Sequence, residues 1–153
     1  MGLSMMGLID ITHKEASAII NNELMGRISE GSGCLNPEYQ YLGIDTDEGL
    51  IGFWVIHYTS HSTLNIHINI LDRFRDDYAL EAGWFFLSHV FSSIPELERV
   101  ECEIPSCYKD VLKFTKKFGF EVEGIKRNAT TRNDKLQDVQ ILGLLRSEYD
   151  GRS

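Results

Sequence analysis

The segment Leu50–Ile56 constrains the fold more than any other part of the chain, because its residues are apolar or glycine and do not alternate with polar ones. A strand with one face in water alternates between apolar and polar residues, whereas a strand covered on both faces does not. We therefore expect this segment to be central in a β-sheet whose two faces both carry helices. The expected fold class is α/β.

Two further strands are expected beside this segment. Tyr39–Asp45 is joined to Gly49–Thr59, which contains the apolar segment, by a short turn rich in Asp and Gly, and such a turn suits an antiparallel pair. The next strand alternates cleanly, with Leu64, Ile66, Ile68 and Ile70 on one face and Asn65, His67 and Asn69 on the other. One face is thus predicted to pack and the other to be polar.

Three helices are predicted, two of them from apolar residues at intervals of three and four. The first, Thr12–Arg27, begins with Thr12 and Glu15 at capping-box spacing, and the third is followed by Gly119 as a C-cap residue. The other expected elements are helices Asp76–Phe91 and Ser106–Phe118, strands Leu97–Ile104, Phe120–Ile125 and Gln137–Leu145, the loop Gly31–Pro37 and the polar segment Lys126–Lys135. This order predicts a mixed sheet in a single domain, residues 1–153, because hairpin-linked strands are antiparallel and helix-linked strands parallel.

Composition narrows the classes of partner. The 153 residues include 15 Lys and Arg against 23 Asp and Glu, a formal net charge of -8. Nucleic acids and anionic membranes are bound through clustered basic residues, so neither is expected as a partner. No apolar run approaches the roughly 20 residues that cross a bilayer, and the first residues lack the features of a secretory signal. We expect a soluble intracellular protein that binds a protein or a small ligand.

Metal and disulfide chemistry are not indicated. Cys34, Cys102 and Cys107 form no Cys-x-x-Cys pair, which argues against a thiolate zinc site or a disulfide framework. His57 and His67 lack a clear carboxylate or cysteine partner, so we expect no metal. Eight basic residues gather in the last third of the chain: Lys109, Lys113, Lys116, Lys117, Lys126, Arg127, Arg132 and Lys135. They suit an acidic partner or a cofactor phosphate, but a solvated surface explains them more simply.

Several strings in the sequence resemble the GNAT family of N-acetyltransferases. They are Ile70-Leu71-Asp72 at a strand end, Val111–Phe120 with its ending Lys117-Phe118-Gly119-Phe120, the following Glu121–Gly124, and the tail Asp138–Arg146. The resemblance covers residues 40–146 and implies a GNAT-like mixed sheet with helices on both faces. Within the family, the strings Ile104-Pro105 and Phe114–Gly124 are most similar to small phage-encoded members.

The resemblance also implies a cofactor and a site. In active members a splayed strand offers backbone groups to the pantetheine arm of acetyl-CoA, and a loop of pattern Arg/Gln-x-x-Gly-x-Gly/Ala cradles the pyrophosphate at a helix N-terminus. A tyrosine in a later helix protonates the leaving thiolate. Carried over, the cofactor-binding positions are Asn69, Leu71, Arg73 and Arg75.

This chain departs from the family pattern at each of those points. With Arg75 as the motif arginine, Tyr78 and Leu80 occupy the positions of the small residues. Asp76 or Asp77 is expected to cap the following helix, which would place a carboxylate where the pyrophosphate belongs. Counting back from Gly119, Thr115 stands at the tyrosine position and Tyr108 at the position of the usual asparagine. Threonine is a poor general acid at neutral pH.

Two interpretations of these departures remain. In the one we favour, a phage-type protein keeps the acetyltransferase scaffold with a degenerate acetyl-CoA site, and acts by contact with a virion or host protein in the host cytoplasm or the virion. In the alternative, it is an acetyl-CoA-dependent N-acetyltransferase acting on a protein or small-molecule amine. Arg73 and Arg75 would then hold the phosphates, Tyr108 would replace the missing acid, and His67 would be the general base. Neither interpretation decides whether the chain forms a homo-oligomer.

Overall fold

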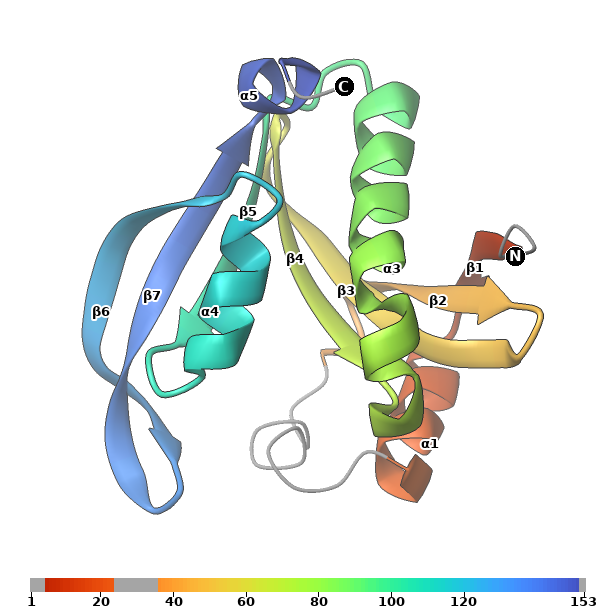
Figure 1. The fold of residues 1–153 in the computed structure, drawn as a ribbon, viewed down its shortest axis with the longest axis horizontal. Coiled ribbons are helices and arrows are strands. Elements are labelled where there is room, and N and C mark those ends of the chain that lie inside the picture. Colours follow the sequence, from red (N-terminus) through yellow and green to blue (C-terminus); the bar gives the residue numbers. More distant parts are fainter. Residues whose placement is uncertain (1–4, 24–35, 152–153) are drawn as a thin grey trace. The chain divides into compact units, whose positions relative to one another are not determined.

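The computed structural model describes residues 5–23 and 36–151 (Figure 1). Its elements in chain order are β1 (Met6–Ile11), α1 (His13–Glu23), β2 (Gln40–Thr46), β3 (Gly49–Ser60), β4 (Thr63–Ile70), α3 (Asp72–Ser93), β5 (Arg99–Pro105), α4 (Lys109–Lys116), β6 (Glu121–Arg132), β7 (Lys135–Leu145) and α5 (Arg146–Asp150). The seven strands form one sheet in the order β1-β2-β3-β4-β5-β7-β6. The β4–β5 pair is parallel, whereas β1–β2, β2–β3, β5–β7 and β6–β7 are antiparallel. The predicted α/β class with a mixed sheet is confirmed.

The chain divides into two compact units. The first combines residues 1–57 with 67–90, and the second combines residues 58–66 with 91–153, each as far as the structure describes it. No helix in the described residues is long and apolar enough to cross a membrane.

The start of α1 in the first unit confirms the predicted capping box. The Thr12 N–H donates to Glu15 Oε1 at 2.9 Å, and the Glu15 N–H donates to Thr12 Oγ1 at 3.0 Å. Two otherwise unpaired amides are thereby satisfied. The predicted end of this helix at Arg27 and most of the predicted loop Gly31–Pro37 lie outside the described residues.

Strand β1 is an addition to the predicted elements. Its residues pair antiparallel with β2, from Met6↔Thr46 to Ile11↔Tyr41. Most of its side chains are half-buried or exposed, as suits a strand at one edge of the sheet. Because only its last residue is buried, the segment has no strong apolar pattern that would have revealed it.

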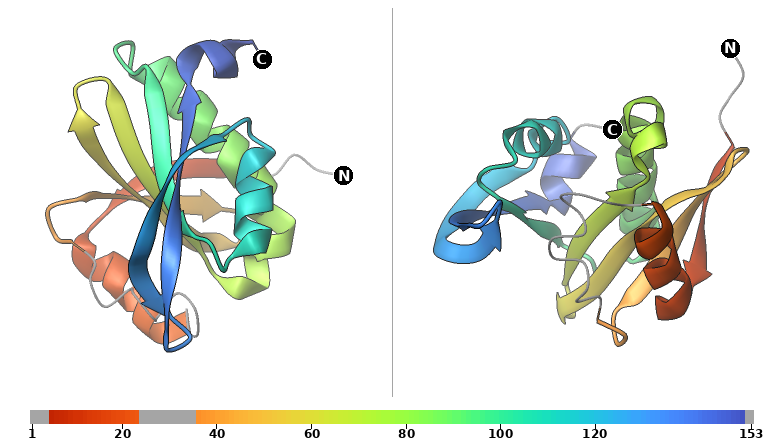
Figure 2. Two further views of the ribbon diagram at one scale, coloured as in Figure 1. Left: turned by 90° about the vertical axis from the view of Figure 1, so that its left-hand side faces the viewer. Right: turned by 90° about the horizontal axis from the view of Figure 1, so that it is seen from below.

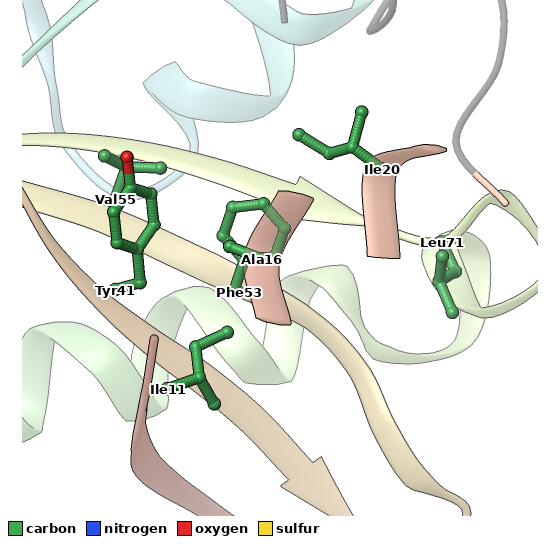
Figure 3. Packing of buried hydrophobic residues seen from close by; sticks show 7 residues of the cluster. All are labelled: Ile11, Ala16, Ile20, Tyr41, Phe53, Val55 and Leu71. Atoms are coloured by element: carbon green, nitrogen blue, oxygen red, sulfur yellow. The ribbon is translucent and has the colours of Figure 1, made fainter. Parts of the chain in front are cut away.

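The centre of the first unit is β3, which is covered on both faces as predicted. On one face, Ala16 and Ile20 of α1 cluster with Tyr41, Phe53 and other buried side chains (Figure 3). On the other, Trp54 stacks on Phe86 of α3 with ring centroids 4.0 Å apart. Adjacent residues of a strand point to opposite faces, so α1 and α3 cover opposite sides of β3 (Figure 2).

The second unit contains the β5, β7 and β6 ladder, with α4 lying on one of its faces (Figure 2). Buried side chains alternate along the central strands, as in Val100 and Cys102 of β5 and in Leu142 and Leu144 of β7. Helix α4 is shorter than the predicted Ser106–Phe118 and has Lys117, not the predicted Gly119, as its C-cap residue. Gly119 lies just beyond it with φ of 101°, a left-handed conformation that suits glycine.

The sequence predicted that the polar segment Lys126–Lys135 separates two short strands, and this prediction is wrong. Strand β6 continues to Arg132, and β7 begins at Lys135. Asn133 and Asp134 form the turn with φ of 56° and 62°, which short Asn and Asp side chains tolerate and which a tight hairpin requires. No residue of β6 is buried and most are exposed, so its polar composition resembled that of a loop.

Candidate functional site

The first part of the candidate site is the end of β4. The parallel register of β4 with β5 comprises three residue pairs, from Thr63↔Arg99 to Asn65↔Glu101. Strand β4 itself continues to Ile70, so its second half lies outside this register. The resemblance predicts a splayed strand at this place.

Asn69 is buried, whereas the sequence predicted it on a polar face. Only 2% of its surface is exposed. Among the described residues, its side-chain nitrogen Nδ2 has no hydrogen-bond partner. A buried amide without an acceptor is costly, and such groups in a folded protein call for a functional or structural explanation.

The chain passes from β4 into α3 through a tightly fixed connection. The backbone of Asn69 and Ile70 crosses so close to Gly52 of β3 that a side chain at Gly52 would collide with it. The Leu71 N–H donates to the Ile51 carbonyl at 2.8 Å. Leu71 is buried and its N–H is engaged within the sheet, while its cofactor-binding role stays a prediction.

The start of α3 corrects the predicted boundary and the predicted cap. The helix begins at Asp72, four residues before the expected Asp76, so Asp76 and Asp77 lie inside it and do not cap it. The Phe74 N–H donates to the Leu71 carbonyl at 2.9 Å. Arg75 pairs with Asp72 at 2.9 Å and approaches the Ile70 carbonyl at 3.5 Å. These contacts favour a helical turn where the family pattern has a loop.

Negative charge surrounds the first turns of α3. The pKa of Tyr78 is raised, first by partial removal from water and then by the carboxylates of Asp47, Glu48, Asp77 and Glu81. Two of these acids come from the turn between β2 and β3 and two from α3 itself. The two predicted phosphate ligands are Arg73, whose guanidinium lies 4.7 Å from the Phe74 ring centroid, and the paired Arg75.

These residues fit acetyl-CoA only in part. Asn69 fits an arm that contains amide groups in one respect, because its Nδ2 lacks an acceptor among the described residues and an amide carbonyl is such an acceptor. The start of α3 does not fit the pyrophosphate loop, because residues 76–80 are helical and their amides therefore bond to carbonyls one turn earlier.

The second unit contains the predicted acid. Tyr108 immediately precedes α4, and its N–H donates to the Pro105 carbonyl at 3.0 Å while its carbonyl accepts from the Leu112 N–H at 3.0 Å. The position of Tyr108 is therefore fixed by the helix start. Thr115 Oγ1 donates to the Val111 carbonyl at 2.8 Å, so this hydroxyl is occupied within its own helix.

The two predicted catalytic residues belong to different units. His67 is exposed on the part of β4 in the first unit, whereas Tyr108 is in the second unit. His57 stacks on Tyr39 with ring centroids 4.1 Å apart. In residues 5–23 and 36–151, no three His, Cys, Asp or Glu side chains gather in a group that could hold a metal ion.

An ion network in the second unit was missed by the sequence reasoning. Arg99 donates to both carboxylate oxygens of Glu123 at 2.9 and 2.8 Å and to Glu101 Oε1 at 2.9 Å. These hydrogen bonds lower the pKa of Glu123 and raise that of Arg99. Glu123 lies at a break in the β6–β7 register and its carboxylate reaches over Gly143. The Glu123-Gly124 step, used above only for the family resemblance, was the available signal for this bulge.

Comparison with solved structures connects this arrangement to known proteins. The chain matches a mutant form of the spermidine/spermine N-acetyltransferase SpeG from Vibrio cholerae with a TM-score of 0.77, over 97% of this chain and 99% of that chain, at 17% identity. A GNAT-family acetyltransferase from Bacillus anthracis matches with a TM-score of 0.62 over 71% of this chain and 67% of that chain, at 20% identity. The fold is that of the GNAT acetyltransferases.

The GNAT fold also matches a structure of the Vibrio cholerae spermidine N-acetyltransferase in complex with CoA and spermine. That match has a TM-score of 0.73 and 15% identity over 94% of this chain and 97% of that chain. No protein-family model and no curated protein sequence matches the chain. The GNAT fold is thus shared at sequence identities too low to carry activity with it.

Proposed function

We propose that the protein is a GNAT-type N-acyltransferase that moves an acetyl group from a thioester donor of the acetyl-CoA class to an amine. The observation that carries this proposal is the early end of the β4–β5 register, together with the buried, unpaired amide of Asn69 in the second half of β4. The solved N-acetyltransferase structures support it, because they match nearly the whole chain. The amine is one of a protein or of a small molecule such as a polyamine.

The reaction has simple proton requirements. The amine nitrogen, once deprotonated, attacks the thioester carbonyl carbon to form the C–N bond. The C–S bond then breaks, and the sulfur leaves with the bonding electrons as a thiolate that takes up a proton. The ammonium form loses one proton to a base before the attack, and the nitrogen loses a second proton once the C–N bond has formed. An acid supplies one proton to the thiolate and is reprotonated from that nitrogen or from water, so each turnover releases one proton to solvent.

We assign these two roles to the residues that the sequence indicates. His67 is the general base, since imidazole titrates near neutral pH and this side chain is exposed on β4. Tyr108 is the general acid, since its backbone is held at the start of α4 while the Thr115 hydroxyl is engaged inside the helix. Each role is worth roughly 10²–10⁴-fold in rate.

The test is thiol release from acetyl-CoA in the presence of polyamines, amino acids and peptides, with transfer of the acetyl group confirmed by mass spectrometry. Tyr108→Phe is expected to lower kcat by roughly 10²-fold or more. Tyr58→Phe is the matched control, because this tyrosine is 51% exposed and has no assigned role. His67→Gln and the turn variant His61→Gln form a second pair. Absence of turnover with every amine, or equal activity of Tyr108→Phe and Tyr58→Phe, would contradict the proposal or its acid.

A second candidate function is favoured by the start of α3. A helical, acidic segment in place of the glycine-rich loop suits a phage-type protein that has lost cofactor binding and acts by contact with a virion or host protein in the host cytoplasm or the virion. Calorimetric titration with acetyl-CoA separates the candidates. This function predicts no binding of acetyl-CoA, whereas acyl transfer requires it to bind and to turn over.

A further inference from the structure

We infer that the acyl donor is recognised through its thioester and pantetheine arm and not through a nucleotide diphosphate. This inference rests on the proposed acyl transfer and narrows its donor class. Donors that end at pantetheine are then used about as well as acetyl-CoA. Three features of the first unit support this inference.

The first feature is the use of the backbone amides at the start of α3. A diphosphate is held at a helix N-terminus by amides that have no partner inside the helix. The family motif would supply them from residues 75–80, but α3 has already begun at Asp72. Amides from residue 76 onward point to carbonyls in the preceding turn, and the Phe74 amide donates to Leu71. The amides of residues 76–80, which the family motif would use, are therefore engaged inside the helix.

The second feature is charge. The stretch from Asp72 to Glu81 carries four carboxylates, Asp72, Asp76, Asp77 and Glu81, against two guanidinium groups, Arg73 and Arg75. Arg75 is already paired with Asp72 at 2.9 Å. Asp47 and Glu48 from the neighbouring turn add to the negative potential felt by Tyr78. A diphosphate brought to this helix start would meet repulsion that an uncharged pantetheine arm does not meet.

The third feature is a buried donor that has no acceptor among the described residues. Asn69, 2% exposed, has a side-chain NH₂ without an acceptor among the described residues. Pantetheine contains two amide carbonyls, and either is an acceptor for such a group. Because Nδ2 is buried, the Asn69 side chain must turn to meet a ligand carbonyl, and the cost of leaving this amide unpaired disappears once that carbonyl accepts from it. Recognition of the arm is thus retained where recognition of the diphosphate is not.

The experiment compares donors with and without the nucleotide. Acetyl-CoA and S-acetyl-pantetheine are assayed side by side for kcat/KM, and CoA and pantetheine are compared for binding by ligand-observed NMR. We expect kcat/KM for acetyl-CoA and for S-acetyl-pantetheine to differ by less than about threefold. The affinities for CoA and pantetheine should differ by no more than that. A diphosphate held by two or more charge-assisted hydrogen bonds would give a preference for CoA of roughly a hundredfold, at about tenfold for each bond.

The outcomes separate this inference from the proposed function. Preference for CoA by more than about tenfold overturns the inference and leaves acyl transfer standing. If Arg75→Gln then abolishes that preference, the phosphates are held by the Arg75 side chain. Comparable binding of CoA and pantetheine without turnover supports the inference and contradicts the proposed function. Absence of binding by either compound overturns both.

A variant of Asn69 tests the retained half of the site. Asn69→Leu keeps the approximate volume but removes the amide donor. We expect KM for acetyl-CoA and for S-acetyl-pantetheine to rise by the same factor, roughly tenfold, with the thermal midpoint monitored to confirm folding. If the folded variant shows no increase in KM for either donor, Asn69 does not bind the arm.

Discussion

Gly52 in β3 and Gly143 in β7 both lie under atoms of a neighbouring strand, but the covering atoms differ in kind. Over Gly52 they are main-chain atoms of Asn69 and Ile70, at the entry to α3. Over Gly143 they are the carboxylate of Glu123, whose nearest oxygen would lie 2.5 Å from an added Cβ. A main chain held in a sheet cannot withdraw, whereas the end of a glutamate side chain can. The comparison predicts a rigid contact in the candidate site and an adaptable one in the β6–β7 hairpin.

Gly52→Ala is expected to have the largest effect. The new methyl group would force the backbone of β4 away from β3, and overpacking against main chain should cost about 3 kcal/mol of unfolding free energy. Chemical denaturation measures this loss, with Gly7→Ala as the control because no atom lies within 4 Å of a Cβ added there. Equal stability of the two variants would show that the contact at Gly52 is adaptable after all.

Arg99→Gln removes the side chain that holds the Glu123 carboxylate over Gly143. Removing the guanidinium leaves Glu101 and Glu123 without their shared cation, and the side chains concerned are only partly buried, with 21% and 39% exposure. We expect a loss of about 1 kcal/mol, at the upper end for partly exposed ion pairs because the geometry is bidentate. Urea unfolding of Lys126→Gln, which removes a more exposed pair with Glu103, is the comparison and should show a smaller loss.

Gly143→Ala is expected to cost less than about 1 kcal/mol, because the Glu123 carboxylate can swing aside at the expense of its hydrogen bonds to Arg99. The decisive measurement is a double-mutant cycle with Glu123→Ala, in which the cost of Gly143→Ala should vanish. Gly124→Ala is the control, since its nearest neighbour is a side-chain atom 3.8 Å away. A cost that persists in the Glu123→Ala background would mean that main chain also presses on Gly143.

The smallest expected effect is that of acid pH on the ion network of Arg99, Glu101 and Glu123. Protonation of Glu123 should lower the unfolding free energy by about half a kcal/mol. Hydrogen bonds from Arg99 lower the pKa of Glu123 below its ordinary value of 4.5 in the folded protein. Such a group stabilises the fold above the unfolded-state pKa, and its contribution is lost as the pH falls through the lowered folded-state pKa. Unfolding free energies of the wild type and Glu123→Gln, measured from pH 7 to pH 3, should therefore converge below about pH 4.5. Parallel pH profiles would contradict this.

The sequence predicted elements whose cause is local or strongly apolar. Thr12 and Glu15 predicted the capping box, because both partners lie within four residues of each other. Leu50–Ile56 predicted a strand covered on both faces, because burial of both faces leaves no alternation of apolar and polar residues. The polar strand β6 was predicted only in part, because exposure removes the apolar signal on which strand prediction depends.

The candidate site was less accessible to prediction. The family pattern placed a loop before Asp76, whereas the Asp72–Arg75 ion pair, at a spacing typical of a helical turn, indicates the earlier start. Asn69 was assigned to a polar face by alternation, but its burial depends on the chain crossing at Gly52, which no local pattern reports. A glycine inside an apolar strand run was the one sign of close backbone approach. The roles of His67 and Tyr108 remain predictions.

The breaks in the β6 register have a consequence for the behaviour of the protein at high concentration. Strand β6 is the last in the sheet order, so one of its sides is not covered by another strand of the described chain. Its pairing with β7 is interrupted between Val122 and Gly124 and again between Lys126 and Thr130. Bulges twist an edge locally and deprive an incoming strand of a long regular template. These breaks therefore make β6 a poor template for edge-to-edge pairing with other chains, the first step toward fibrils.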